Sequence, residues 1–291
     1  MEYLTLDRYL RERFGEKLYR LALDGGMTCP NRDGTVGTGG CTFCLEGSGS
    51  FAQQRTASVA RQLAEAKERI RAKTKAQRFI AYFQSYTNTY APIDYLERLF
   101  TETIEQPDVA VLDIATRPDC LDDEVIALLK RLNEIKPVWV ELGLQTIHPR
   151  TAAAINRCWE LPCFDSAMER LNAAGLETIV HVILGLPGES REDMAATVRY
   201  AAQSGAKGIK LQLLHILEGT PMAEQYRRGE VRVMELDEYC SLLAGLLPLI
   251  PPDMVIHRLT GDGDKRYLLA PLWSGDKKRV LNAINKVLRQ N

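Results

Sequence analysis

Three cysteines, Cys29, Cys41 and Cys44, lie within one glycine-rich stretch, CPNRDGTVGTGGCTFC. Closed zinc sites and most iron–sulfur centres use four protein ligands, so this set is one ligand short. Three thiolates on a four-iron cube leave one iron open to bind another molecule. The glycines allow the backbone to wrap closely around a bulky cluster. The stretch therefore predicts a metal centre with an open coordination position, which becomes a reaction site if a pocket adjoins it.

The main alternative for these cysteines is a zinc ribbon. Such a site needs a fourth Cys or His at matching spacing. The other candidates are scattered along the chain: Cys120, Cys158, Cys163 and Cys240, with His148, His181, His215 and His257. We interpret these as small buried or incidental thiols and hydrogen-bonded structural histidines. The charged, amphipathic N-terminus is not a secretory signal, so the seven cysteines favour metal ligation or free thiols over disulfides.

The elements that must position this stretch are six apolar, strand-like runs that alternate with helical patterns. The predicted strands are 18–25, 78–88, 109–119, 138–147, 177–188 and 208–217. Buried strands alternating with helices indicate a parallel sheet covered by helices. No GxGxxG follows the first strand, so we predict an α/β fold of the partial (β/α)6 TIM-like barrel type. The core would span residues 1–225 with an N-terminal extension, and residues 226–291 would form a C-terminal extension packed on it, with a strand at 255–263 and a helix at 277–290.

Polar groups follow the predicted strands at the end where such barrels carry their sites. They are Gln84 and Ser85, Thr116 and Arg117, Glu141 and Gln145, Gly185, and Gln212. Glu141 and Gln145 should share a face because strand side chains repeat every two residues, whereas Gln212 and His215 should point to opposite faces. We expect these groups to surround a cofactor pocket beside the cysteines.

Composition is that of an ordinary globular protein: 291 residues, 45% hydrophobic, 26% charged and a net charge of −1. No segment reads as a membrane span, so we expect a cytoplasmic protein. Two local segments are basic. Residues 61–78 carry seven Lys or Arg against two Glu, and residues 265–291 carry seven against one Asp. Each is either a solvated helix face or a surface for a nucleic-acid backbone.

At this point the chain resembles a known superfamily. The cysteine stretch and HVILGLPGE are similar to radical S-adenosylmethionine (SAM) enzymes of the branch related to the catalytic subunit of elongator. With AYFQSYT, ATRPDC, ELGLQTIH, INR, GIKLQLLHI and APLW, the resemblance narrows to the YtqA/YhcC family and covers residues 6 to 285. Relatives with an INRGHD-like segment differ from the INRCWE found here, so no role is carried over to Cys158 or Trp159.

The resemblance implies a radical SAM partial barrel and two cofactors, a [4Fe–4S] cluster and SAM. Cys29, Cys41 and Cys44 would hold three irons, SAM would chelate the fourth, and reductive cleavage would give a 5′-deoxyadenosyl radical. A flavodoxin- or ferredoxin-type donor would supply the electron. The implied SAM contacts are Gln84 and Ser85 at the methionyl amine, Arg117 or Arg157 at the carboxylate, Glu141 and Gln145 at the ribose, and Gly185 beside the adenine, with Thr116 and Gln212 as further polar groups.

Some members of the YtqA branch modify the tRNA wobble uridine. They convert 5-carboxymethylaminomethyluridine to 5-aminomethyluridine, which a partner methyltransferase then methylates. The resemblance therefore implies tRNA as a partner. Two alternatives stay open: a radical SAM enzyme acting on a peptide or small metabolite, and a non-catalytic iron–sulfur or zinc protein.

Overall fold

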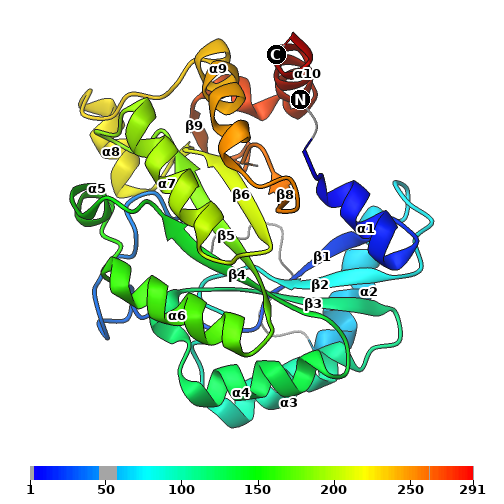
Figure 1. Ribbon diagram of the computed structural model, residues 1–291. Coiled ribbons are helices and arrows are strands. Elements are labelled where there is room, and N and C mark those ends of the chain that lie inside the picture. The colour runs from blue at the N-terminus through cyan, green and yellow to red at the C-terminus, as the bar shows by residue number, and fades with distance from the viewer. Residues whose placement is uncertain (1–2, 46–57, 262, 291) are drawn as a thin grey trace.

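A computed structural model describes residues 3–45, 58–261 and 263–290. Its main feature is a seven-stranded, fully parallel sheet in the order β1-β2-β3-β4-β5-β6-β8. The strands are β1 Tyr19–Leu23, β2 Phe79–Phe83, β3 Val109–Thr116, β4 Val138–Gln145, β5 Glu177–Leu184, β6 Gly208–Leu213 and β8 Val255–Arg258. The sheet curls into an open half-barrel (Figure 1).

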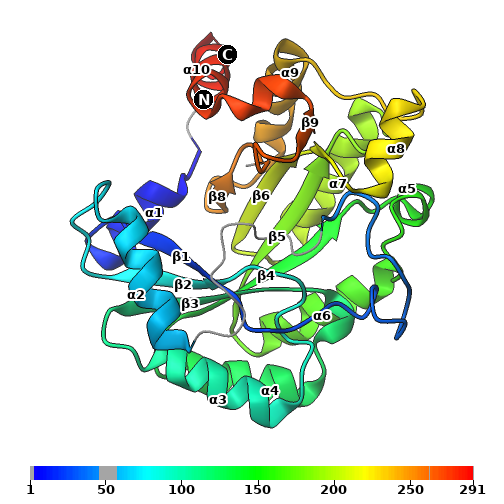
Figure 2. The ribbon, with the colours of Figure 1, turned by 180° about the vertical axis from the view of Figure 1, so that it is seen from behind.

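Helices cover the outer face of this sheet, as the alternating pattern predicts (Figure 2). They are α2 Val59–Ile70, α3 Ile93–Ile104, α4 Asp123–Asn133, α6 Leu161–Ala173, α7 Arg191–Gln203 and α9 Leu236–Leu246. The chain also forms α10 Lys277–Gln290, which packs on α9, and the short helices α5 Pro149–Ala154 and α8 Pro221–Arg227. A capping box begins α7: Ser190 and Asp193 each accept a hydrogen bond from the other's backbone N–H. In the described parts of the chain, no helix is long and apolar enough to cross a bilayer.

The strands are apolar on both faces because each face packs against something. Outward-facing residues such as Leu112, Leu142 and Val182 are fully buried under the helices in the main hydrophobic cluster. Facing inward near the amino ends of the strands are Ile80, Val111, Trp139 and Ile179. This second layer packs against α1 (Leu6–Phe14), which therefore plugs the bottom of the half-barrel. The cavity described below lies at the opposite, carboxyl ends.

The segment after residue 225 contributes to the barrel wall. The strand predicted at 255–263 is β8, shorter than expected, and it extends the sheet from six strands to seven beside β6. A two-stranded antiparallel sheet, β7 (Ile216–Leu217) and β9 (Leu268–Ala270), sits beyond the carboxyl end of β6. After β9 come η3 (Leu272–Gly275) and α10, which packs on α9. On its free side β8 meets the start of the chain, where the N–H of Ile256 donates to the carbonyl of Leu4 at 2.8 Å.

Candidate active site

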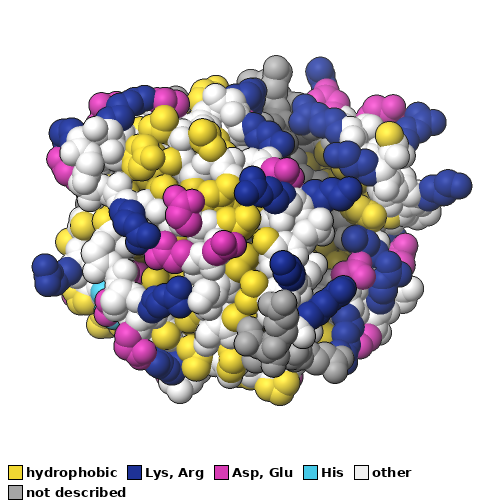
Figure 3. All heavy atoms as spheres, turned by 90° about the horizontal axis from the view of Figure 1, so that it is seen from above, with side chains coloured by type: hydrophobic (Ala, Val, Ile, Leu, Met, Phe, Trp, Pro, Cys, Tyr) yellow, Lys and Arg dark blue, Asp and Glu magenta, His cyan; other side chains and the backbone are white. Residues whose placement is uncertain are grey.

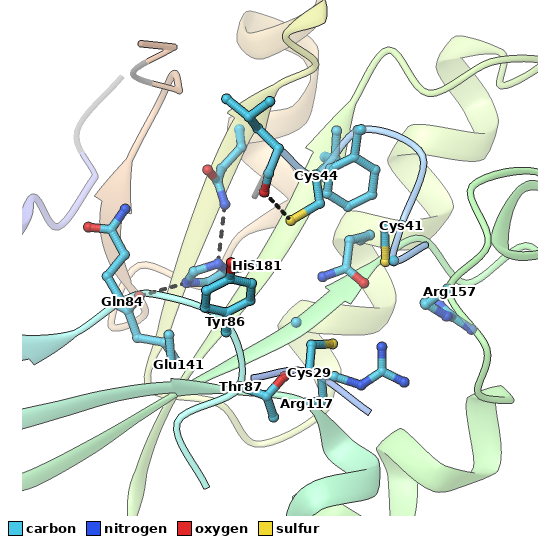
Figure 4. A pocket seen from close by; sticks show the side chains of 18 of the residues that line it. Cys29, Cys41, Cys44, Gln84, Tyr86, Thr87, Arg117, Glu141, Arg157 and His181 are labelled. Atoms are coloured by element: carbon cyan, nitrogen blue, oxygen red, sulfur yellow. Dashed lines mark hydrogen bonds and ion pairs between the residues drawn. The ribbon is translucent and has the colours of Figure 1, made fainter. Parts of the chain in front are cut away.

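A cavity of about 320 Å³ opens at the carboxyl ends of the strands. Cys29, Cys41 and Cys44 all line it, although they come from a loop of 16 residues. Figure 4 shows their sulfur atoms around a common space, with Glu141 and His181 on its far side. The cavity therefore has a thiol-lined end and a polar floor.

The cysteine loop is held by its own hydrogen bonds. The amide of Arg32 donates to the carbonyl of Cys29 at 2.8 Å, and the amide of Cys44 donates to the carbonyl of Cys41 at 2.9 Å. The Arg32 guanidinium donates to the carbonyl of Cys44 at 2.6 Å. Gly40 has φ +77°, and a Cβ there would lie 2.8 Å from Arg32 Nε, so this turn requires glycine.

A second segment, residues 155–159, fixes the loop from behind. The Asn156 side chain donates to the carbonyls of Thr38 at 3.2 Å and Gly40 at 2.8 Å. In return, the Asn31 side chain donates to the Asn156 carbonyl at 2.5 Å. Sequence reasoning missed both asparagines. The available signal was the INR motif at residues 155–157. Its central asparagine carries neither a charge nor a thiol, so the simplest role for it is to hold backbone groups in place.

The donor set fits a multi-iron cluster. Burial, together with the charges of Cys44 and Cys29, raises the pKa of Cys41 to about 12. Thiolates this close together therefore need a metal to stabilise their charge. Among the described residues, no three Cys, His, Asp or Glu side chains are grouped so that they could hold one metal ion. A cube binds each thiolate through a different iron, so its ligands need not converge on one point. The three cysteines would hold the cluster.

Backbone strain is concentrated around this cavity. The described residues other than glycine with positive φ are Tyr86, Gln145, Asn156 and Cys158, at φ 53° to 61°. Tyr86 and Gln145 line the cavity, and the other two belong to the segment behind the cysteine loop. Such conformations cost on the order of 1–3 kcal/mol each and persist where the surrounding structure imposes them. Their clustering is independent support for a functional site here.

The structure brings most of the predicted cofactor residues to the cavity. Seven line it: Gln84, Thr116, Arg117, Glu141, Gln145, Arg157 and Gln212. Two do not. Ser85 is buried to 3% exposure away from the lining, and a Cβ on Gly185 would meet the Met234 side chain at 2.6 Å. The strand ends turn sharply at these positions, so the side chains that reach the cavity after β2 are Gln84, Tyr86 and Thr87.

The expectation that only one of Gln212 and His215 faces inward was wrong. Both line the cavity. β6 ends at Leu213, so the two-residue period no longer applies at His215.

The two arginines predicted to bind the SAM carboxylate differ in how many of their N–H groups already have an acceptor. Arg157 is 2% exposed and gives four of its N–H groups to the carbonyls of Leu144, Thr146 and Trp159. Arg117 gives two of its five to the Asp119 carboxylate, at 2.9 and 2.7 Å. Burial lowers the pKa of Arg157 to about 10, whereas Asp119 more than offsets the effect of burial on Arg117 and raises its pKa. Arg117 therefore has more donors left for an anionic ligand.

The floor of the cavity is a buried ionic network centred on Glu141. Its carboxylate accepts hydrogen bonds from Tyr82 (2.6 Å), His181 (2.8 Å), Arg20 (3.2 Å) and Lys210. These donors come from β2, β5, β1 and β6, so the network ties four strands to β4. Four donors use most of the acceptor capacity of a carboxylate. The contacts of Glu141 thus point to a structural centre and away from the ribose contact expected of it.

The pKa values of the ionisable groups in this floor are shifted in different directions. Burial and the neighbouring Glu141 charge raise the pKa of Asp113 to about 7, while Arg20 donates to it at 3.0 Å. Burial would raise the pKa of Glu141, but the charges of Lys210 and His181 hold it well below its usual value. Burial lowers the pKa of Lys210 to about 8 although Glu141 opposes this. Sequence reasoning missed Arg20, Tyr82, Asp113 and Lys210; ionisable or polar residues at the centre of apolar strands were the signal.

Comparison with known proteins now agrees with this geometry. The Radical SAM superfamily profile matches residues 32–201, and the Radical_SAM C-terminal domain profile matches residues 206–290. The chain belongs to the radical SAM superfamily. Radical SAM membership implies a [4Fe–4S] cluster and SAM as cofactors, as predicted from the motifs.

The radical SAM relatives narrow the family further. The chain is 47% identical to YtqA of Bacillus subtilis over 287 residues, which covers 98% of this chain and 89% of YtqA. This confirms the YtqA/YhcC assignment. The chain is also 27% identical to the tRNA uridine(34) acetyltransferase of Methanocaldococcus jannaschii over 165 residues, which covers 55% of this chain and 30% of that protein.

The radical SAM fold is confirmed by a solved structure. The archaeal Methanocaldococcus infernus Elp3 superposes with a TM-score of 0.69 at 17% identity. The match covers 92% of this chain and 63% of that one. The predicted partial barrel is therefore correct in class, with seven strands in its sheet.

Proposed function

We propose that this radical SAM protein acts on the wobble uridine of tRNA and converts 5-carboxymethylaminomethyluridine to 5-aminomethyluridine. The observation that carries the proposal is the similarity to tRNA uridine(34) acetyltransferase, which spans more than half of this chain. The Elp3-like fold is compatible with it. A cavity with thiols at one end and cations at the other is compatible with a substrate that carries a negative charge.

This cleavage of a carbon–nitrogen bond calls for radical chemistry. The bond to be broken joins the amine nitrogen to the carboxymethyl carbon, and the C–H bonds of that carbon resist acid–base attack. When bound, the cluster and SAM supply the removal of a hydrogen atom from such a carbon, with SAM as the two-electron oxidant overall. Addition of water to the oxidised carbon–nitrogen bond would then release the amine and glyoxylate. The protein's own tasks are to hold the cofactors, to orient the substrate and to exclude water from the site.

The assignment of residues to these tasks follows the cavity. Cys29, Cys41 and Cys44 would hold the cluster. Arg117, with donors to spare, would bind the SAM carboxylate, and Gln84 and Gln145 would contact polar groups of SAM. Phe43 and Trp159 also line the cavity and would supply apolar surface against a planar ring. A flavodoxin- or ferredoxin-type protein would deliver the electron, and a tRNA methyltransferase would use the product.

The deciding experiment has two arms. The first is the wobble-nucleoside profile of tRNA from a strain that lacks this protein, where we expect the carboxymethylaminomethyl form to accumulate and to disappear on complementation. The second is turnover of that tRNA by the reconstituted protein with SAM and a reductant under anaerobic conditions. An unchanged profile together with SAM cleavage unaffected by tRNA would contradict the proposal and favour a peptide or metabolite substrate.

A further inference from the structure

The inner faces of β5 and β6 carry side chains that line the cavity one above another. His181 and Ile183 do so from β5, two residues apart, and Lys210 and Gln212 do so from β6. The two strands pair with His181 beside Lys210 and Ile183 beside Gln212. Gln212 is therefore one step nearer the carboxyl ends of the strands than Lys210. Its amide lies between the ionic floor and the opening of the cavity, next to the apolar side chain of Ile183.

A chain of two hydrogen bonds begins at Glu141 and ends at this amide. Burial would raise the pKa of Glu141, but the charges of Lys210 and His181 hold it well below its usual value, so the group is a carboxylate and cannot donate. His181 Nε2 is therefore the donor in their 2.8 Å contact. Burial and the charge of Lys210 lower the pKa of His181, so the ring is neutral at pH 7 and its Nδ1 is an acceptor. Nδ1 accepts from the amide nitrogen of Gln212 at 3.2 Å.

The bond to His181 fixes which way round the Gln212 amide is held. An amide carries two N–H groups and a carbonyl oxygen with two lone pairs. Within the described parts of the chain, the bond to His181 is the only one that the Gln212 side chain makes. One N–H and the carbonyl are therefore left for a ligand, on a side chain that lines the cavity. The cavity wall thus presents a donor beside an acceptor, in an order that His181 does not allow to reverse.

We propose that Gln212 binds the imide edge of the uracil ring of the substrate. Its carbonyl accepts from the N3–H of the ring, and its remaining N–H donates to the ring carbonyl next to N3. Paired contacts of this kind select a base by the order of donors and acceptors along its edge. His181 and Glu141 are positioning residues, because they act through the amide. The inference rests on the proposed function, which supplies a uridine, and adds the residue that recognises the base.

The adenine of SAM is the rival ligand for the same amide, because its amino group also lies beside a ring acceptor. The experiment therefore follows the two ligands separately. Binding to the cluster-loaded protein is measured by anaerobic calorimetry, for SAM alone and for uridine probes with SAM present. The probes are 5-carboxymethylaminomethyluridine and its 3-methyl derivative, which lacks the N3–H. Each is offered as a free nucleoside and at the wobble position of an anticodon stem–loop.

The variants are Gln212→Met, Gln212→Leu and the matched control Gln203→Met, whose glutamine is exposed at the end of α7. Loss of a hydrogen bond that leaves an acceptor in the cavity unpaired predicts that wild type binds the N3–H probe roughly tenfold or more tightly than the methylated probe. Gln212→Met should bring this ratio close to one, and Gln203→Met should keep it. Gln212→Leu provides the test if Gln212→Met does not fold, as judged by circular dichroism and cluster absorbance.

A double-mutant cycle tests the positioning role of His181. His181→Leu leaves the amide free to turn, so it should reduce the same ratio by a smaller factor. Added to Gln212→Met, it should change the ratio no further, because the amide through which it acts is gone. A role confined to the stability of the floor would change the affinity for both probes alike and leave their ratio as in wild type.

The uracil contact and the tRNA function fail on different results. If the free nucleosides give a Gln212-dependent ratio while neither stem–loop binds, the uracil contact stands and the tRNA function falls. If wild type binds neither nucleoside, binds both equally, or keeps its ratio in both Gln212 variants, the uracil contact is overturned whatever the substrate. A severalfold loss of SAM affinity in Gln212→Met, with the ratio unchanged, would also overturn it and assign the amide to the adenine.

Discussion

Cys41 is held in place from two sides, by the turn to Cys44 and by the Asn31 amide, 3.7 Å from its sulfur. Cys41→Ala should abolish SAM cleavage because one iron loses its ligand, and iron content should fall clearly below about four per chain. Anaerobic reconstitution with iron and sulfide assays checks this. Cys163→Ala is the control, since Cys163 does not line the cavity and should leave both readouts intact. Full cleavage by Cys41→Ala would show that another ligand set is in use.

Asn156 offers a test of the support behind the cluster. Asn156→Gly keeps the left-handed backbone at φ 53° accessible but removes the two hydrogen bonds to Thr38 and Gly40. We expect the cluster still to form and to be lost severalfold faster to a chelator, as followed by the decay of its visible absorbance. Gly229→Ala, at a residue that does not line the cavity, controls for a general effect of changing a left-handed position. Equal decay rates in wild type and Asn156→Gly would remove Asn156 from the site.

At the scale of elements, α1 closes the amino end of the half-barrel through a few apolar side chains. Leu10 is 2% exposed and packs in the inner layer, where Tyr9 also meets Trp139 at a ring-centroid distance of 6.2 Å. Leu10→Ala should lower the free energy of unfolding by about 2–5 kcal/mol because it removes buried surface and leaves a cavity. Urea titration at constant m-value checks this. Leu272→Ala, at a residue that is 74% exposed, should change it by less than about 0.5 kcal/mol.

The strands and the cysteine loop could be predicted because their patterns are local. Apolar runs predicted six of the seven strands of the sheet, and β8 was predicted as a strand of the C-terminal extension. Cysteine spacing predicted three thiols that the structure brings to one cavity. The floor could not be predicted in the same way, because Glu141 is held by partners 40 to 121 residues away in sequence. Which donor reaches which acceptor depends on the stagger between strands, including the register shift between Gly143 and Gln145. The prediction that His215 and Gln212 face opposite ways failed for a related reason, because the direction of His215 depends on where β6 ends.

At the scale of the whole molecule, Lys and Arg side chains gather on the side that carries α1, α2 and α10 (right in Figure 3). The two basic segments belong to different elements of this side. The basic end of α2 leads into the amino end of β2, away from the cavity. The first turn of α10 follows β9 and η3 in the chain. β9 pairs with β7, and Leu217 of β7 lines the cavity. A tRNA that inserts its wobble base should therefore contact α10.

Reversing the charge of each basic segment in turn tests which of the two binds tRNA. Changing Lys277, Lys278 and Arg279 to Glu should weaken tRNA binding roughly tenfold or more at low salt and reduce its salt dependence. Acidic residues suit the first turn of a helix, so unfolding is not expected. The matched control changes Arg69, Arg71 and Lys73 to Glu and should leave binding unchanged. Filter binding across a salt series gives the answer, and the reverse outcome would place the RNA at the amino end of the barrel.

The hydrogen bond between Leu4 and Ile256 has a consequence for how the barrel opens. In the described chain the sheet does not close on itself, so β1 and β8 are its two edges. Residues 4 to 23 run from one edge to the other, through α1 into β1, and so form a strap across the gap. The Ile256 amide thereby becomes a native reporter. Its hydrogen-exchange rate measures how often residue 4 separates from β8, and slower exchange on cofactor loading would show that ligands in the cavity stabilise this contact.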